Sequence, residues 1–245
     1  FAPKGANKLA EQQAAWWNSP LYRNEELIER PADLSTLTQR YTDEAVKFIQ
    51  ANKAKPFFLY FPHTYPHTPL FASKSFSGTS PRGLYGDVVE ELDASVGKVL
   101  DTLRAEKLAD NTFVFFTSDN GPETTSVVHM RADHGHDGAR PWRGVKRDQW
   151  EGGHRVPFLV RWPARVKPAV SDQLLCLTDV FATVAEIVGE RLPENAGEDY
   201  GYYTRNYEYY SARGQSDGAK RAAGSASGEK GDAKDRIRLR EEDRA

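Results

Sequence analysis

The sequence predicts an α/β protein in which helices flank a mainly parallel sheet. Apolar runs of strand length alternate along the chain with longer segments whose apolar residues recur at a helical period. Strand, helix, strand and helix in this order favour parallel strands, because each helix carries the chain back to the start of the next strand. Polar residues gather in the loops after the strands, where functional groups lie on such a scaffold.

The first part of the chain predicts strands around one long helix. Short apolar stretches at 16–22 and 27–28 flank a polar turn and predict two short strands. Ser35 or Thr36 then caps a helix, because the apolar residues that follow keep one face buried. The aromatic and aliphatic run at 57–61 has no polar interruption, so it predicts a strand buried on both faces.

The remainder repeats this pattern. Apolar residues at a helical period predict a second long helix over 85–103. Strands are expected at 111–116, 156–162 and 174–177, and a last helix at 179–188. The intervening segment, from 121 to 153, is polar and is expected to form a long loop.

Bulk properties exclude several classes of protein. The 245 residues suit one large domain or a core with an appendage. A net charge of −2 offers no basic field for nucleic acid, and no apolar run approaches the roughly 20 residues that span a bilayer. The single cysteine, Cys176, allows neither an internal disulfide nor a cysteine-rich metal site. It lies among leucines, where a thiol is usually inert.

Composition also predicts a domain boundary. Residues 1–199 hold nearly all of the apolar pattern, whereas 200–245 become rich in Gly, Ala, Ser and mixed charge after a cluster of tyrosines. Such a tail buries too little surface to offset its ordering entropy, so we expect it to be disordered. The chain begins with Phe1 rather than Met and shows no signal peptide, which is compatible with a fragment of a longer protein.

A carboxylate and a carboxamide stand where a predicted strand ends. Asp119 and Asn120 follow the apolar run at 111–116 and precede Gly121. In open α/β sheets, ligands bind just beyond the carboxyl ends of strands. These oxygens suit a hard divalent cation such as Ca²⁺, but Asp-Asn-Gly is also an ordinary turn sequence. The residues alone leave both interpretations open.

Two histidines lie in the Pro-rich loop that follows the strand at 57–61. For His63 we expect an ordinary hydrogen bond from the ring to a backbone carbonyl. For His67 we expect contact with a ligand instead, because of the motif Pro66–Pro69 in which it lies.

A second loop carries a candidate cation. Lys146 lies near glycines and can reach an anion as a compact point charge, or it can be a solvated surface lysine. Glu151 and Arg155 are expected to form an ion pair that braces this loop. Gly152 and Gly153 are expected to adopt backbone angles that other residues resist.

The same polar segment holds a histidine-rich group. His129, His134 and His136, with Asp133 and Asp137, could bind a transition metal, since imidazole suits Zn²⁺. Their spacing matches no specific zinc signature, so we favour a polar loop that faces the substrate.

Several motifs, in matching order and spacing, resemble the type I sulfatases over about 19–199. Individually they are weak and together they are highly specific. They are Pro56–Phe61 leading to Pro66–Pro69, Tyr85–Asp87 with Glu91–Gly97, Phe115–Pro122, and the block from Arg143 to Pro157.

The resemblance implies a partial alkaline-phosphatase-like domain that hydrolyses a sulfate monoester of a carbohydrate or aryl compound. It implies that Asp119 and Asn120 hold Ca²⁺ and that His67 and Lys146 contact the sulfate, with either able to protonate the leaving oxygen. It further implies an exported protein, periplasmic or extracellular.

One departure from the family pattern is large. The family's formylglycine nucleophile arises within a Cys/Ser-x-Pro/Ala-x-Arg motif, and that motif is absent here. We therefore expect the isolated chain to be inactive. Two alternatives stay open: a phosphoesterase of the same superfamily with a two-zinc site, and a non-catalytic module that binds an anion or Ca²⁺.

Overall fold

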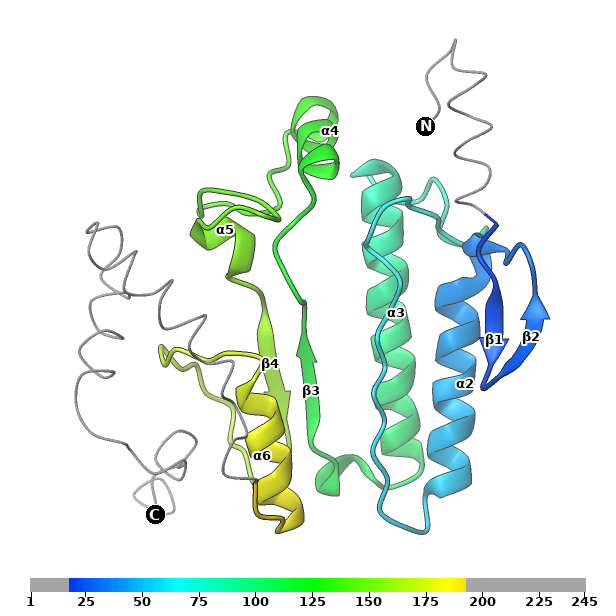
Figure 1. Cartoon of the computed structure of the whole chain (residues 1–245), viewed down its shortest axis with the longest axis vertical. Coiled ribbons are helices and arrows are strands. Elements are labelled where there is room, and N and C mark those ends of the chain that lie inside the picture. Colours follow the sequence, from blue (N-terminus) through cyan, green and yellow to red (C-terminus); the bar gives the residue numbers. More distant parts are fainter. Residues whose placement is uncertain (1–17, 193–245) are drawn as a thin grey trace. The chain divides into compact units, whose positions relative to one another are not determined.

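The computed structural model describes residues 18–192, which divide into two compact units at Lys167. The first unit holds all elements except the last helix, α6 (Figure 1). The predicted tail at 200–245, the boundary at 199 and the tryptophans at 16 and 17 lie outside the described residues. No helix within 18–192 combines the length and the apolar character that crossing a membrane requires.

The first strands form the expected hairpin. β1 (Leu21–Arg23) pairs antiparallel with β2 (Glu26–Glu29). Asn24 has a φ of 53° in the turn between them, a conformation that asparagine tolerates better than most residues.

Two long helices, α2 (Leu37–Asn52) and α3 (Gly83–Ala105), pack side by side (Figure 1). Their contact buries two apolar clusters, one around Leu37 and Val88 and one around Ile49 and Leu103. A hydrogen bond between the hydroxyls of Thr42 and Ser95 satisfies the polar groups buried between the helices.

The start of α2 differs in detail from the prediction. Thr36 is the residue before the helix, but its hydroxyl donates to the carbonyl of Asp33 instead of accepting from a helical N–H. A short 3₁₀ helix, η1 (Leu34–Thr36), precedes α2, and the Asp33 carboxylate caps it by accepting from the Ser35 N–H at 3.0 Å.

The second strand pair is antiparallel, which corrects the prediction of a mainly parallel sheet for the residues described. β3 (Val114–Thr117), entered through η2 (Ala109–Asn111), pairs with β4 (Phe158–Arg161). Both strand pairs within 18–192 are antiparallel. The segment between β3 and β4 leaves and returns at the same end of the pair, so β4 must run in the opposite direction.

The apolar run at 57–61 is extended but is not paired as a strand. Phe57 and Leu59 pack on the cluster around Ile49 and Leu103. Phe58 and Tyr60 point the other way and are 71% and 77% exposed, so the prediction of burial on both faces is wrong for one face. A continuous apolar run indicates two covering layers, and the described residues supply one.

Two helices lie inside the segment predicted as a long loop. α4 (Thr124–His134) and α5 (Glu151–His154) were missed because α4 carries few apolar residues and α5 is a single turn. The strand expected at 174–177 is likewise not formed.

The last helix confirms the sequence pattern. In the second unit, α6 (Asp179–Val188) ends at Gly189, whose φ of 77° is the left-handed conformation expected of a helix-terminating glycine.

Candidate active site

Two loops meet at the carboxyl end of β3. The loop after β3 carries Asp119 and Asn120, and the loop before β4 carries Lys146. The Gly121 N–H donates to the carbonyl of Gly153 at 2.9 Å. The N–H of Lys146 donates to the carbonyl of Pro122 at 2.8 Å. The backbone thus holds the predicted metal ligands and the predicted cation on adjoining loops.

An ion pair reinforces this junction. The Arg147 guanidinium donates to both carboxylate oxygens of Glu123, at 2.8 and 3.0 Å. These hydrogen bonds from Arg147 lower the pKa of Glu123, and the charge of Lys146 adds a smaller contribution in the same direction. Since Arg147 follows Lys146 directly, the pair fixes the backbone of the lysine against the loop after β3.

Gly152 and Gly153, in the loop before β4, are required because backbone atoms of that loop approach them closely. Neither Gly152 nor Gly153 has a positive φ, so the prediction of unusual backbone angles is wrong. A Cβ on Gly152 would lie 2.2 Å from the carbonyl oxygen of Gly144, and one on Gly153 would lie 2.1 Å from that of Asp148. A side chain at either position would push the turns of the loop apart.

Two arginine–tryptophan stacks also stabilise the loop before β4. The guanidinium of Arg143 lies 4.0 Å from the ring centre of Trp150, and that of Arg155 lies 3.9 Å from the ring centre of Trp142. Arg155 also pairs with Glu151 at 3.1 Å, which confirms the predicted bracing ion pair.

The side chains of Asp119 and Asn120 are not engaged by other described residues. Asp119 is exposed and Asn120 is half-buried, and within 18–192 neither side chain has a hydrogen bond or ion pair. One carboxylate and one amide oxygen fit a hard cation such as Ca²⁺. In the same region, no three residues of the types His, Cys, Asp and Glu gather to hold a metal. Asp119 and Asn120 would supply two side-chain oxygens to a Ca²⁺ ion, which takes six to eight.

Lys146 and His67 lie on separate loops. Lys146 is half-buried, and its ammonium has no hydrogen bond or ion pair in the described part of the chain. His67 is exposed, and its Nδ1 lies 2.5 Å from the carbonyl oxygen of Thr68. A proton on Nδ1 makes this contact favourable and leaves Nε2 for a ligand. The described contacts join Lys146 to the loop of Asp119 and Asn120, and none of them joins His67 to that group.

The histidine-rich group does not assemble. His129 and His134 are five residues apart on α4, so about 140° of helix rotation separates their side chains. His134 lies instead against Gly83 at the start of α3. The carboxylate of Asp137 is held by arginines 131 and 140.

His63 also departs from its prediction. Its Nδ1 is buried with no hydrogen-bond partner among the described residues, so the expected bond to a carbonyl is not formed. Its Nε2 lies 3.4 Å from the Ser95 hydroxyl, and the ring packs against Phe61 at 4.3 Å between centres. Burial lowers the pKa of His63 to about 4, because the charged imidazolium loses its hydration.

This burial predicts a pH dependence of stability. Above pH 6.5 the ring is neutral in both the folded and the unfolded chain; between 6.5 and about 4 only the unfolded chain binds the proton. The free energy of unfolding should therefore fall by up to about 3 kcal/mol as the pH drops through that window. Urea titrations should show a steeper fall in the wild type than in His63→Phe, in which only the carboxylates with lowered pKa, such as Glu44, still contribute. His129→Gln, a change at an exposed histidine, should keep it, and equal slopes in wild type and His63→Phe would contradict the assignment.

Comparisons with known proteins agree with the motif pattern. A family model described as Sulfatase matches residues 3–190. Among curated relatives, an arylsulfatase of Hemicentrotus pulcherrimus is 42% identical over 173 residues, covering 71% of this chain and 30% of its own. The N-acetylgalactosamine-6-sulfatase of Homo sapiens is 42% identical over 193 residues, covering 74% and 36%.

A solved structure is similar in fold to this chain. The crystal structure of Ps i-CgsB in complex with k-i-k-neocarrahexaose has a TM-score of 0.63 and 27% identity, and the match covers 84% of this chain and 48% of that one. The chain spans about a third of the length of the curated relatives it matches.

Proposed function

Because the chain belongs to the sulfatase family, we propose that it serves the hydrolysis of a sulfate monoester of a carbohydrate or aryl compound. The observation that supports this most directly is the junction at the end of β3. There, two side-chain oxygens and one ammonium that form no hydrogen bond or ion pair within residues 18–192 lie on loops that are hydrogen-bonded together. A sulfate ester is an anion, and negative charge grows on its leaving oxygen during cleavage.

Lys146 and His67 would each interact with that negative charge. The Lys146 ammonium binds a sulfate oxygen as a point charge, and its backbone is already fixed, so little reorganisation is required. The Nε2 of His67 accepts or donates a proton at the substrate, while its Nδ1 stays on the Thr68 carbonyl. Either group could protonate the leaving oxygen.

Asp119 and Asn120 would hold the Ca²⁺ that the family resemblance implies, together with oxygens from outside the described residues. When bound, the cation supplies positive charge that stabilises the sulfate oxygens. The two side chains fit this role because no other described residue occupies their oxygens.

The substrate class is proposed on similarity. One relative is named for a sulfated amino sugar, and the matched crystal structure contains an oligosaccharide. We therefore propose a sulfated glycan as the natural substrate. Action outside the cytoplasm, which the family resemblance implies, stays a prediction.

Replacement of Lys146 tests the proposal. The product of the complete coding sequence, co-expressed with a formylglycine-generating enzyme, should hydrolyse 4-methylumbelliferyl sulfate, whereas the 245-residue chain should not. Lys146→Ala should lower kcat/KM about 10²- to 10³-fold, the typical effect of removing one group that stabilises developing charge. Lys55→Ala, at an exposed lysine on the segment after α2, should leave kcat/KM unchanged.

Two results would count against the proposal. Equal kcat/KM for Lys146→Ala and Lys55→Ala would remove Lys146 from the site. Faster turnover of the matching phosphate ester, with bound Zn²⁺ in place of Ca²⁺, would favour the phosphoesterase alternative.

A further inference from the structure

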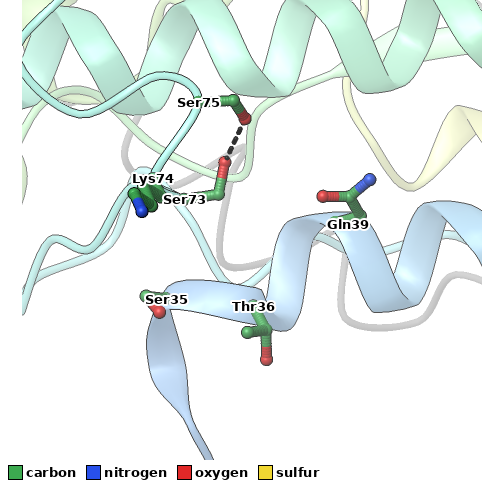
Figure 2. Close-up of a pocket in the computed structure, with 6 residues that line it drawn as sticks. All are labelled: Ser35, Thr36, Gln39, Ser73, Lys74 and Ser75. Carbon is green, nitrogen blue, oxygen red and sulfur yellow. Dashed lines mark hydrogen bonds between the residues drawn. The ribbon is translucent and has the colours of Figure 1, made fainter.

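An open surface hollow of about 520 Å³, lined by polar residues, lies between η1 with the start of α2 and the loop that follows His67. Figure 2 shows the side chains that line it, with Ser73 bonded to Ser75 on one wall and Gln39 on the other. These are Ser35, Thr36, Gln39, Ser73, Lys74 and Ser75. The lining contains hydroxyls, one amide and one cation, and no carboxylate.

On both walls, a lining residue is held in place by a hydrogen bond to a carboxylate outside the lining. The N–H of Ser73 donates at 2.8 Å to the buried carboxylate of Glu91 on α3. On the opposite wall, Asp33 accepts from both the N–H and the hydroxyl of Ser35, at 3.0 and 2.7 Å. The backbone of the two walls is therefore held in place, whereas the exposed side chains of Lys74 and Gln39 must become ordered when a ligand binds.

The lining side chains that can still bind a ligand are complementary to an anionic sugar. The Lys74 ammonium and the Gln39 amide have no hydrogen bond or ion pair within residues 18–192. Lys74 offers three donors and a positive charge, and Gln39 offers two donors and an acceptor. The serine hydroxyls, already donating or paired, can still accept hydrogen bonds. A polyhydroxylated ring with one negative substituent would use all of these groups.

The hollow also lies within reach of the candidate active site. Ser73 follows His67 by six residues on one loop, so their Cα atoms can be no more than about 20 Å apart. A ligand of several rings could place one ring in the hollow and another at His67.

We propose that this hollow is a subsite for a sugar ring that carries an anionic substituent, on the same glycan as the ester to be cleaved. This inference rests on the proposed function, which supplies the glycan. It adds a recognition site apart from the candidate site residues His67, Lys146, Asp119 and Asn120, and it makes Lys74 a specificity-determining residue.

The test is a titration of the isotopically labelled 245-residue chain, followed by NMR. A 6-sulfated chondroitin tetrasaccharide should shift the amide resonances of Gln39 and of 73–75. Lys74→Ala should weaken its Kd about five- to tenfold, as expected for an exposed charge-assisted contact, and Lys74→Arg should restore part of the loss. Lys55→Ala removes the same charge elsewhere and should leave the Kd unchanged.

Other probes identify the anion. The desulfated tetrasaccharide keeps its carboxylates, so equal binding would assign the subsite to a carboxylate, whereas weaker binding would assign it to a sulfate. Equal binding of neutral chitotetraose, shifts confined to other residues, or equal losses in Lys74→Ala and Lys55→Ala would overturn the subsite.

The two proposals can fail separately. Sulfate ester hydrolysis is measured on an aryl sulfate, which has no sugar ring, and the shifts are measured without turnover. Hydrolysis without shifts at 39 and 73–75 would remove the subsite, whereas those shifts without hydrolysis by the complete gene product would remove the sulfatase proposal.

Discussion

Gly121→Ala is expected to lower the free energy of unfolding by about 3 kcal/mol or more. A Cβ at this position would lie 1.8 Å from the carbonyl oxygen of Gly152 and 2.9 Å from its carbonyl carbon. Both atoms belong to backbone, so no flexible side chain can move aside. The hydrogen bond from the Gly121 N–H to Gly153 holds the loops at this separation, and the new methyl group must break it.

Gly97→Ala is the matched control, because it adds the same methyl group to another glycine. Gly97 lies within α3, and a Cβ there would meet no atom within 4 Å. Alanine is the better helix former, so this variant should gain about 0.5–1 kcal/mol. Urea unfolding followed by circular dichroism measures both changes. A midpoint for Gly121→Ala equal to that of the wild type would show that the two loops are not in contact in solution.

The sequence predicted the parts of the fold that depend on local pattern. The helices α2, α3 and α6 have sustained apolar periods, and the β1–β2 hairpin has a polar turn between short apolar runs. Each of these elements is specified by residues within one stretch of chain, so its position could be predicted without knowledge of its partners.

The remaining features depend on contacts between distant residues. The antiparallel pairing of β3 with β4 is set by where a 40-residue connection returns, and no local period records that. The prediction that Phe58 and Tyr60 are buried was wrong. An apolar run carries no information on how many layers are present to cover it.

The candidate site likewise combines positions set by local pattern with a contact between distant residues. The position of Asp119 and Asn120 at the end of a strand follows from local pattern, but their approach to Lys146 does not. That approach is made by backbone hydrogen bonds, which any residue type can form. The glycines 121, 152 and 153 were its signal in the sequence, and all three serve close packing, although unusual backbone angles were expected for Gly152 and Gly153.

A second large loss of stability is expected at Asp87, whose buried carboxylate binds the backbone just before α3. Asp87 is 2% exposed, and its two carboxylate oxygens accept three backbone N–H groups. The donors are Gly78 at 2.8 Å, Thr79 at 3.1 Å and Ser80 at 2.8 Å. Asp87→Ala would leave these donors without their acceptor, and we expect a loss of about 3–5 kcal/mol.

Glu90→Ala, on the exposed face of the same helix, should change the free energy of unfolding by less than about 0.5 kcal/mol. Hydrogen exchange distinguishes the proposed cause from general destabilisation. In Asp87→Ala under native conditions, the amides of Gly78, Thr79 and Ser80 should exchange faster than those at the centre of α3, because they lose their acceptor directly. Uniform acceleration in both segments would show that Asp87 stabilises the fold without ordering this loop. Selective acceleration would show that one buried carboxylate orders residues 78–80, which follow the loop segment that lines the hollow.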